Sequence, residues 1–155
     1  MSSIKLLHGR RSEFGAFYAV TIVTRKRKTP FLDGAAVECL SRELSVLMNE
    51  GRADSLAWVA MPDHLHWLFQ LRDGSLGECV GRFKSRTARS IGSLTGNAES
   101  VWQPGYYDHR LRDEDDLLAQ ARYLIENPLR EGLAGRIEDY PFWSCRWIAR
   151  HSELA

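Results

Sequence analysis

The chain has 155 residues, of which 44% are hydrophobic and 26% are charged, a balance typical of one globular domain with a single core. Lys and Arg number 21 and Asp and Glu 20, so the net charge of +1 gives no overall indication of a nucleic-acid or membrane partner. The length excludes two domains of ordinary size, and no segment has the pattern of a membrane span or a secretory signal, so we expect a single cytoplasmic domain over residues 1–155.

The first half of the chain predicts a strand, a helix and a β-hairpin. Residues 16–24 are rich in β-branched and aromatic side chains, which favours a strand. A helix with an aspartate cap is predicted over 33–51. Two further strands, 56–61 and 64–71, are joined by Pro62-Asp63, a pair suited to a tight turn, so we expect an antiparallel hairpin.

The second half predicts two helices separated by a short strand. Ser75 and Glu78 have the spacing of a capping box. The helix that follows has one apolar face and one exposed basic face. A strand is predicted at 106–111 and a helix at 113–126, whose acidic first turn suits the positive end of the helix dipole. The order β-α-β-β-α-β plus a helix predicts an α+β fold, a ferredoxin-like antiparallel sheet with an added C-terminal helix.

Two histidines lie on one predicted strand, in the segment Met61-Pro-Asp-His-Leu-His-Trp-Leu-Phe-Gln-Leu71. Side chains alternate along a strand, so His64 and His66 point to one face while Leu65 and Trp67 point to the other. Two imidazoles on one face are suitable ligands for one divalent metal ion, and two surface histidines are an equally good alternative. No cysteine pair is near to complete a structural zinc site, so we favour an open, catalytic metal position.

The helix predicted at 113–126 places Tyr123 on its polar side. Its apolar positions lie within one arc and are Leu117, Leu118, Ala121, Leu124 and Ile125. Because Tyr123 lies nearly opposite this arc, a packing role is disfavoured, and an ordinary exposed tyrosine is the alternative. Asn127 follows by about one helical turn, where its carboxamide oxygen is suited to be a third, hard metal ligand.

The histidine pair of the predicted strand and the tyrosine of the predicted helix together suggest phosphoryl transfer. Tyrosine is a poor nucleophile at its ordinary pKa of about 10, but a metal ion that polarises a phosphoryl oxygen makes attack by a positioned phenol feasible. The basic candidates for binding a phosphate backbone are Arg10, Arg11, Arg25, Lys26, Arg27, Lys28, Arg82, Lys84, Arg86 and Arg89. Trp102, Tyr106 and Tyr107 are candidates for stacking on unpaired bases. For each residue alone, a solvated surface or a core aromatic is the stronger interpretation.

Several motifs, in this order and spacing, resemble the REP-associated tyrosine transposases, which are histidine-hydrophobic-histidine single-strand nucleases. They are His64-Leu-His66 preceded by Met-Pro-Asp, the stretch 101–112, the stretch 123–133, and Tyr140-Pro-Phe-Trp-Ser-Cys145. The resemblance covers nearly the whole chain.

The resemblance implies that His64 and His66 bind Mg²⁺ or Mn²⁺, that Tyr123 is the nucleophile and that Asn127 completes the metal site. It implies cleavage of single-stranded DNA beside REP-like hairpins, with a 5′-phosphotyrosine link, a free 3′ hydroxyl and no need for ATP. It further implies a bacterial, nucleoid-associated protein without a membrane partner, acting as a monomer or a homodimer.

Two other functions stay open. A catalytically inactive protein that binds hairpin or single-stranded DNA has the same basic residues, and a metal-dependent phosphodiesterase that activates water does not need the tyrosine. Tyr106 and Tyr107 also compete with Tyr123 as nucleophiles. They alternate on a predicted strand, so only one of the two can face a site on the sheet.

Overall fold

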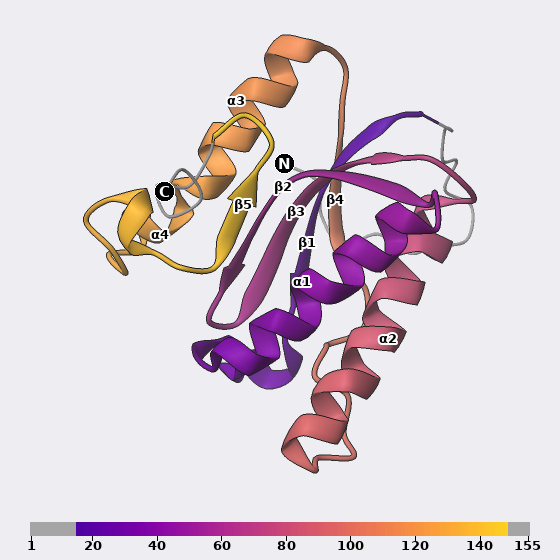
Figure 1. Cartoon of the computed structure of the whole chain (residues 1–155), viewed down its shortest axis with the longest axis vertical. Coiled ribbons are helices and arrows are strands. Elements are labelled where there is room, and N and C mark those ends of the chain that lie inside the picture. Colours follow the sequence, from indigo (N-terminus) through magenta and orange to yellow (C-terminus); the bar gives the residue numbers. More distant parts are fainter. Residues whose placement is uncertain (1–14, 149–155) are drawn as a thin grey trace.

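A five-stranded antiparallel sheet forms the centre of the computed structural model, which describes residues 15–148 (Figure 1). The strand order is β4-β1-β3-β2-β5, and each neighbouring pair is antiparallel. The strands are β1 (Phe17–Val23), β2 (Ala53–Met61), β3 (His64–Leu71), β4 (Tyr107–Leu111) and β5 (Trp143–Cys145). The first four strands have the predicted ferredoxin-like arrangement.

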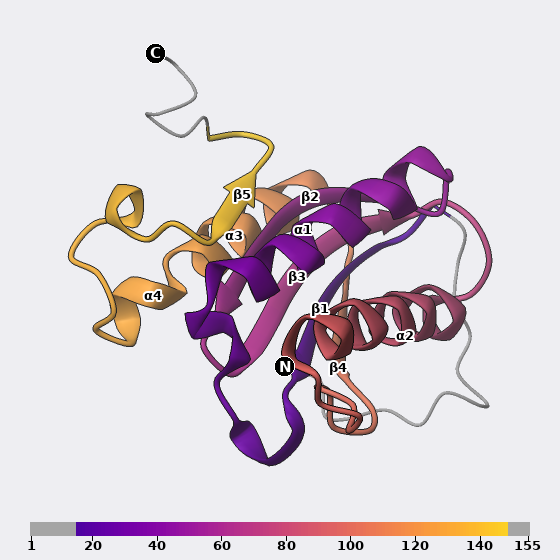
Figure 2. The same cartoon turned by 60° about the horizontal axis from the view of Figure 1, so that its bottom comes forward.

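Helices cover both faces of the sheet. They are α1 (Gly34–Asn49), α2 (Leu76–Thr95), α3 (Glu114–Ile125) and α4 (Asn127–Arg130), with short 3₁₀ turns at Arg25–Arg27, Pro30–Leu32 and Ile137–Asp139. The two helices α1 and α2 lie side by side on one face, and α3 lies on the other (Figures 1 and 2). None of the helices within residues 15–148 is long and apolar enough to cross a membrane.

Side chains at the predicted helix starts cap the first turns of their helices. The Asp33 carboxylate accepts a hydrogen bond from the Ala35 amide, and the Asp113 carboxylate accepts one from the Asp116 amide. Ser75 and Glu78 form the predicted reciprocal capping box at the start of α2. These caps satisfy amide groups that the first helical turn leaves unpaired, which fixes where each helix starts.

Three local features differ from the prediction. The fifth strand, β5, was not predicted, because three residues are too few to show an alternating pattern. The fourth strand begins at Tyr107 rather than at 106. Leu118, expected on the apolar face of its helix, is exposed.

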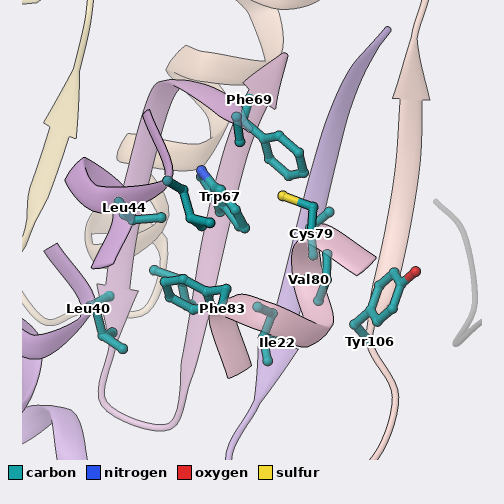
Figure 3. Packing of buried hydrophobic residues seen from close by; sticks show 14 of the residues in the cluster. Ile22, Leu40, Leu44, Trp67, Phe69, Cys79, Val80, Phe83 and Tyr106 are labelled. Atoms are coloured by element: carbon teal, nitrogen blue, oxygen red, sulfur yellow. The ribbon is translucent and has the colours of Figure 1, made fainter. Parts of the chain in front are cut away.

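The larger core lies between the sheet and α1 and α2. Figure 3 shows Trp67 and Phe69 of β3 packing with Phe83 of α2, and the Trp67 and Phe69 rings stack with centroids 4.0 Å apart. Trp102 and Tyr106 belong to this core with exposed fractions of 2% and 3%. Neither ring is therefore open to stack on a DNA base, and these two expectations were wrong.

A buried hydrogen bond ties Trp102 to α2, and its removal should destabilise the fold. The Trp102 Nε1–H donates to Thr87 Oγ1 at 2.9 Å, and that hydroxyl donates to the Phe83 carbonyl at 2.7 Å. Thr87→Val keeps the shape but leaves the indole N–H unpaired, so we expect a loss of about 1–3 kcal/mol in the free energy of unfolding, measured by urea titration.

Ser90→Ala is the matched control for that measurement. The Ser90 hydroxyl also donates to a carbonyl of the preceding turn, that of Arg86 at 3.1 Å, but it is exposed to solvent. We expect a change within about 0.5 kcal/mol. Equal effects of the two substitutions would contradict a special role of the buried bond.

The second core lies under α3 and orients that helix. Leu117, Ala121, Leu124 and Ile125 pack onto the opposite sheet face, against side chains that include Val59 and Leu68. Tyr123 lies off this buried stripe, with 60% of its surface exposed, as the helical period predicts. The packing of α3 thus determines which side chains it holds over the sheet face that carries the histidines.

Candidate active site

The two histidines of β3 face each other. Their side chains lie on the same face of the strand, and the two Nε2 atoms are 3.1 Å apart, with the rings nearly perpendicular at 87°. The prediction that these residues share a face is therefore confirmed by the geometry. A single cation beside the pair would meet two nitrogen donors from one rigid strand.

Asp63 orients His64. Oδ1 of Asp63 lies 2.7 Å from Nδ1 of His64, and its Oδ2 accepts a hydrogen bond from Arg27 at 3.0 Å. Burial raises the pKa of Asp63, but the hydrogen bonds from His64 and Arg27 outweigh it, and the net pKa is below its ordinary value. An ionised carboxylate can only accept, so Nδ1 of His64 carries a proton toward Asp63, which leaves Nε2 as the ring nitrogen that can bind a ligand.

His66 is oriented from the neighbouring strand. Thr21 of β1 is its partner across the sheet, and Thr21 Oγ1 lies 2.9 Å from Nδ1 of His66. Burial lowers the pKa of His66 to about 3, and the nearby charges of His64 and Arg130 act in the same direction. The imidazole is therefore neutral at neutral pH, which is the form that binds metal ions.

A small cavity of about 70 Å³ lies between His66 and α3. His66, Tyr107, Tyr123 and Arg130 are among the residues that line it, together with Gln120 and His109. The cavity places the predicted nucleophile next to the predicted metal ligand, although the two are far apart in the sequence. This shared cavity is the central feature of the candidate site.

Tyr107 also reaches the cavity, through the register of three strands. Tyr107 of β4 pairs with Thr21 of β1, which pairs with His66 of β3. Side chains of directly paired residues lie on the same face, so Tyr107 stands in one row with Thr21 and His66. Of the two competing tyrosines, Tyr106 is in the core and only Tyr107 faces the site, in agreement with the expected alternation.

Arg130 is a site residue that the sequence reasoning missed. Its guanidinium carbon lies 3.7 Å from the centre of the Tyr123 ring, and its Nη2 donates to the Tyr123 carbonyl at 2.6 Å. The only signal in the sequence is a basic residue a short distance beyond the predicted helix. Its spacing of seven residues from Tyr123 is about two helical turns, but the predicted helix ended before Arg130.

Asn127 differs from its expected setting. Helix α3 ends at Ile125, and Asn127 begins α4 with its side chain largely buried, whereas Tyr123 is exposed. Among residues 15–148, no cluster of three or more His, Cys, Asp or Glu side chains is placed to hold a metal ion. Any third protein ligand beside the histidines would therefore be of another type, and the carboxamides of Asn127 and Gln120 are the nearest in chain position to Tyr123.

The basic residues have different surroundings. Arg10 and Arg11 lie outside the described residues. Lys26 and Lys28 are exposed, Arg25 donates to the Ser100 carbonyl, and Arg27 binds Asp63. The turn that carries them is held on the β2–β3 turn by Thr24, whose hydroxyl is 3.0 Å from the Asp63 carbonyl.

The basic face expected on α2 is only partly exposed. Arg89 is exposed and Arg82 is half-buried. Lys84 donates to the carbonyls of Gln103 and Gly105, and burial lowers its pKa. Arg86 forms ion pairs with Glu43 and Glu50 at 2.9 and 3.1 Å. The expectation of full exposure was wrong for Lys84 and Arg86, because contacts with neighbouring elements occupy both.

Comparison with known proteins assigns the family. The model of the family described as "Transposase IS200 like" matches residues 14–127. The REP-associated tyrosine transposase of Escherichia coli (strain K12) is 24% identical over 130 residues, covering 83% of this chain and 75% of that protein. A solved REP-associated tyrosine transposase bound to a REP hairpin has the same fold, with a TM-score of 0.74 at 22% identity over 92% of this chain and 82% of that one. The resemblance expected from the motifs is confirmed, and the chain belongs to the IS200-like transposase family.

Proposed function

We propose that this protein is a metal-dependent endonuclease and strand transferase that cleaves single-stranded DNA near REP-type hairpins through a 5′-phosphotyrosine intermediate. The observation that carries the proposal is the cavity shared by His66 and Tyr123, beside two imidazole nitrogens 3.1 Å apart. Two comparisons support DNA as the substrate. The chain belongs to a transposase family, and a relative with a similar fold is bound to a REP hairpin.

The donor set fits a divalent cation such as Mg²⁺ or Mn²⁺. His64 and His66 would hold it through their Nε2 atoms, and the Asn127 carboxamide would be the third ligand. A bound cation supplies Lewis-acid chemistry, polarising a phosphoryl oxygen and neutralising charge that develops on it. The hydrogen bonds at Asp63 and Thr21 keep both imidazoles oriented for this role.

Tyr123 would perform the bond exchange. Its phenol oxygen attacks the phosphorus, the bond from phosphorus to the 3′ oxygen breaks, and the proton lost by the phenol balances the one gained by the new 3′ hydroxyl. One phosphodiester replaces another, so the reaction needs no ATP. Attack by a 3′ hydroxyl on the phosphotyrosine reverses the step and rejoins a strand.

The basic residues would bind the DNA backbone. The exposed Lys26 and Lys28 lie on a turn held against the Asp63 end of the site, and Arg89 adds charge on α2. Binding that rests on such contacts weakens steeply as salt rises. We propose a bacterial, nucleoid-associated setting and action as a monomer or homodimer.

Covalent trapping tests the function. The protein is incubated with Mn²⁺ and a labelled single-stranded hairpin from the DNA beside its gene, and the label is followed on a denaturing gel. A labelled protein band is the expected result. Salt-sensitive binding without cleavage would favour the inactive DNA-binding alternative, and cleavage without a labelled band would favour a water-activating phosphodiesterase.

Removing the Asp63 carboxylate should weaken metal binding. Asp63→Ala takes away the group that holds the Nδ1 proton and ring orientation of His64. We expect the Kd for Mn²⁺, measured by calorimetry, to rise about 10–100-fold. Asp54→Ala is the control, since Asp54 forms a partly exposed ion pair with Arg72 at 3.7 Å, away from the histidines. Unchanged Mn²⁺ binding in Asp63→Ala would contradict the orienting role.

A further inference from the structure

We propose that Arg130 binds the phosphate that Tyr123 attacks, and that the same guanidinium holds the tyrosine ring in place. The inference rests on the proposed function, because it assigns a role in that reaction to a residue outside the histidine and tyrosine motifs. Arg130 also lies past residues 14–127, the segment that the family model matches.

The contacts of Arg130 fix the Tyr123 ring. One nitrogen, Nη2, donates to the Tyr123 carbonyl at 2.6 Å, while the guanidinium plane lies over the ring, 3.7 Å from its centre. A cation over an aromatic face is attracted by the negative charge of the ring face. The two contacts restrict an otherwise exposed side chain to the cavity that His66 lines.

Arg130 lies seven residues after Tyr123, beyond a one-residue interruption between α3 and α4. Helix α3 ends at Ile125, and α4 starts at Asn127 with Pro128 in its first turn. The Leu133 amide then donates to the Pro128 carbonyl at 2.8 Å, which secures the end of the short helix. Arg130 is thus carried on ordered backbone rather than on a free chain end.

The charge of Arg130 is not neutralised by a neighbouring carboxylate within residues 15–148. Arg27, Arg52, Arg86 and Arg136 each form an ion pair of 4 Å or less, whereas Arg130 forms none with the described residues. A guanidinium with no carboxylate partner, lining the cavity with His66 and Tyr123, makes this end of the cavity suitable for an anion.

The chemistry of the guanidinium fits a phosphate under attack. Arginine has five N–H donors in a planar fork that matches two phosphate oxygens, and the carbonyl of Tyr123 engages only one nitrogen. Negative charge spreads over the nonbridging oxygens as phosphoryl transfer proceeds, so a donor fixed beside them stabilises the transition state. Lysine has the charge but lacks the planar stack and the fork.

The test compares Arg130→Ala and Arg130→Lys with the wild type in single-turnover adduct formation at saturating hairpin DNA and Mn²⁺. We expect the rate to fall about 10²–10³-fold in Arg130→Ala. Arg130→Lys should recover only a minor part of it. Methylguanidinium added to Arg130→Ala should raise the rate at least about tenfold, because it restores the missing donor, an effect that a purely structural role would not produce.

Arg122→Ala is the matched control, since Arg122 is an exposed arginine of α3. Its rate should stay within about threefold of wild type and should not respond to methylguanidinium. Circular dichroism and Mn²⁺ calorimetry confirm that each variant is folded and binds the cation. A wild-type rate in Arg130→Ala or Arg130→Lys, or no rescue, overturns the inference alone. Absence of any adduct with the wild-type protein overturns the proposed function, and the role of Arg130 with it.

Discussion

Tyr123→Phe is expected to abolish the covalent link between protein and DNA. The phenol oxygen is the only atom removed, and phenylalanine can still lie over the Arg130 guanidinium, so the fold and the cavity should persist. Loss of a nucleophile removes the covalent route entirely, and we expect the yield of labelled protein to fall at least about 10⁴-fold. Gel analysis after incubation with Mn²⁺ and labelled hairpin DNA measures it.

Tyr107→Phe is the control that makes this experiment decisive. Tyr107 lines the same cavity and stands in one row with Thr21 and His66, so it is the one competing tyrosine that faces the site. Its substitution should leave the adduct in place. A labelled band that persists in Tyr123→Phe and disappears in Tyr107→Phe would exchange the roles of the two residues.

The sequence predicted those parts of the site that depend on local periodicity. Alternation along β3 was enough to place His64 and His66 on one face, and the helical period was enough to place Tyr123 off the buried stripe of α3. Both arguments need only the geometry of one element. The caps at Asp33 and Ser75 were predictable for the same reason, since their partners lie two or three residues away.

The missed features depend on contacts between distant segments. The row from Tyr107 through Thr21 to His66 exists only because β4 and β3 both pair with β1. Trp102 and Lys84 are of residue types that often bind DNA. In the folded chain, Trp102 is buried in the core, and Lys84 donates to the carbonyl of Gln103. No pattern within a single segment contains that information.

The loss of one imidazole should have the largest effect on metal binding. His64→Ala and His66→Ala each remove one of two nitrogens that converge from the same strand, and the remaining ring has no second imidazole beside it. We expect the Mn²⁺ affinity to fall by more than the roughly 100-fold upper limit for an orienting partner such as Asp63. Calorimetry with Mn²⁺ measures the affinity, and chelation of the cation by EDTA in the wild type should likewise prevent adduct formation.

His109→Ala is the control for these Mn²⁺ measurements, because it removes a histidine that lines the cavity but is not a proposed ligand. His109 is exposed and lines the same cavity from β4, so it shares the surroundings of His66 without facing His64. Its substitution should leave Mn²⁺ binding unchanged. If His109→Ala weakened binding as much as His66→Ala, the ion would have to lie toward β4, and the two Nε2 atoms of β3 would not be its main ligands. If His64→Ala and His66→Ala both bound Mn²⁺ normally, the two converging Nε2 atoms of β3 would not be the ligands, and the proposed metal site would be wrong.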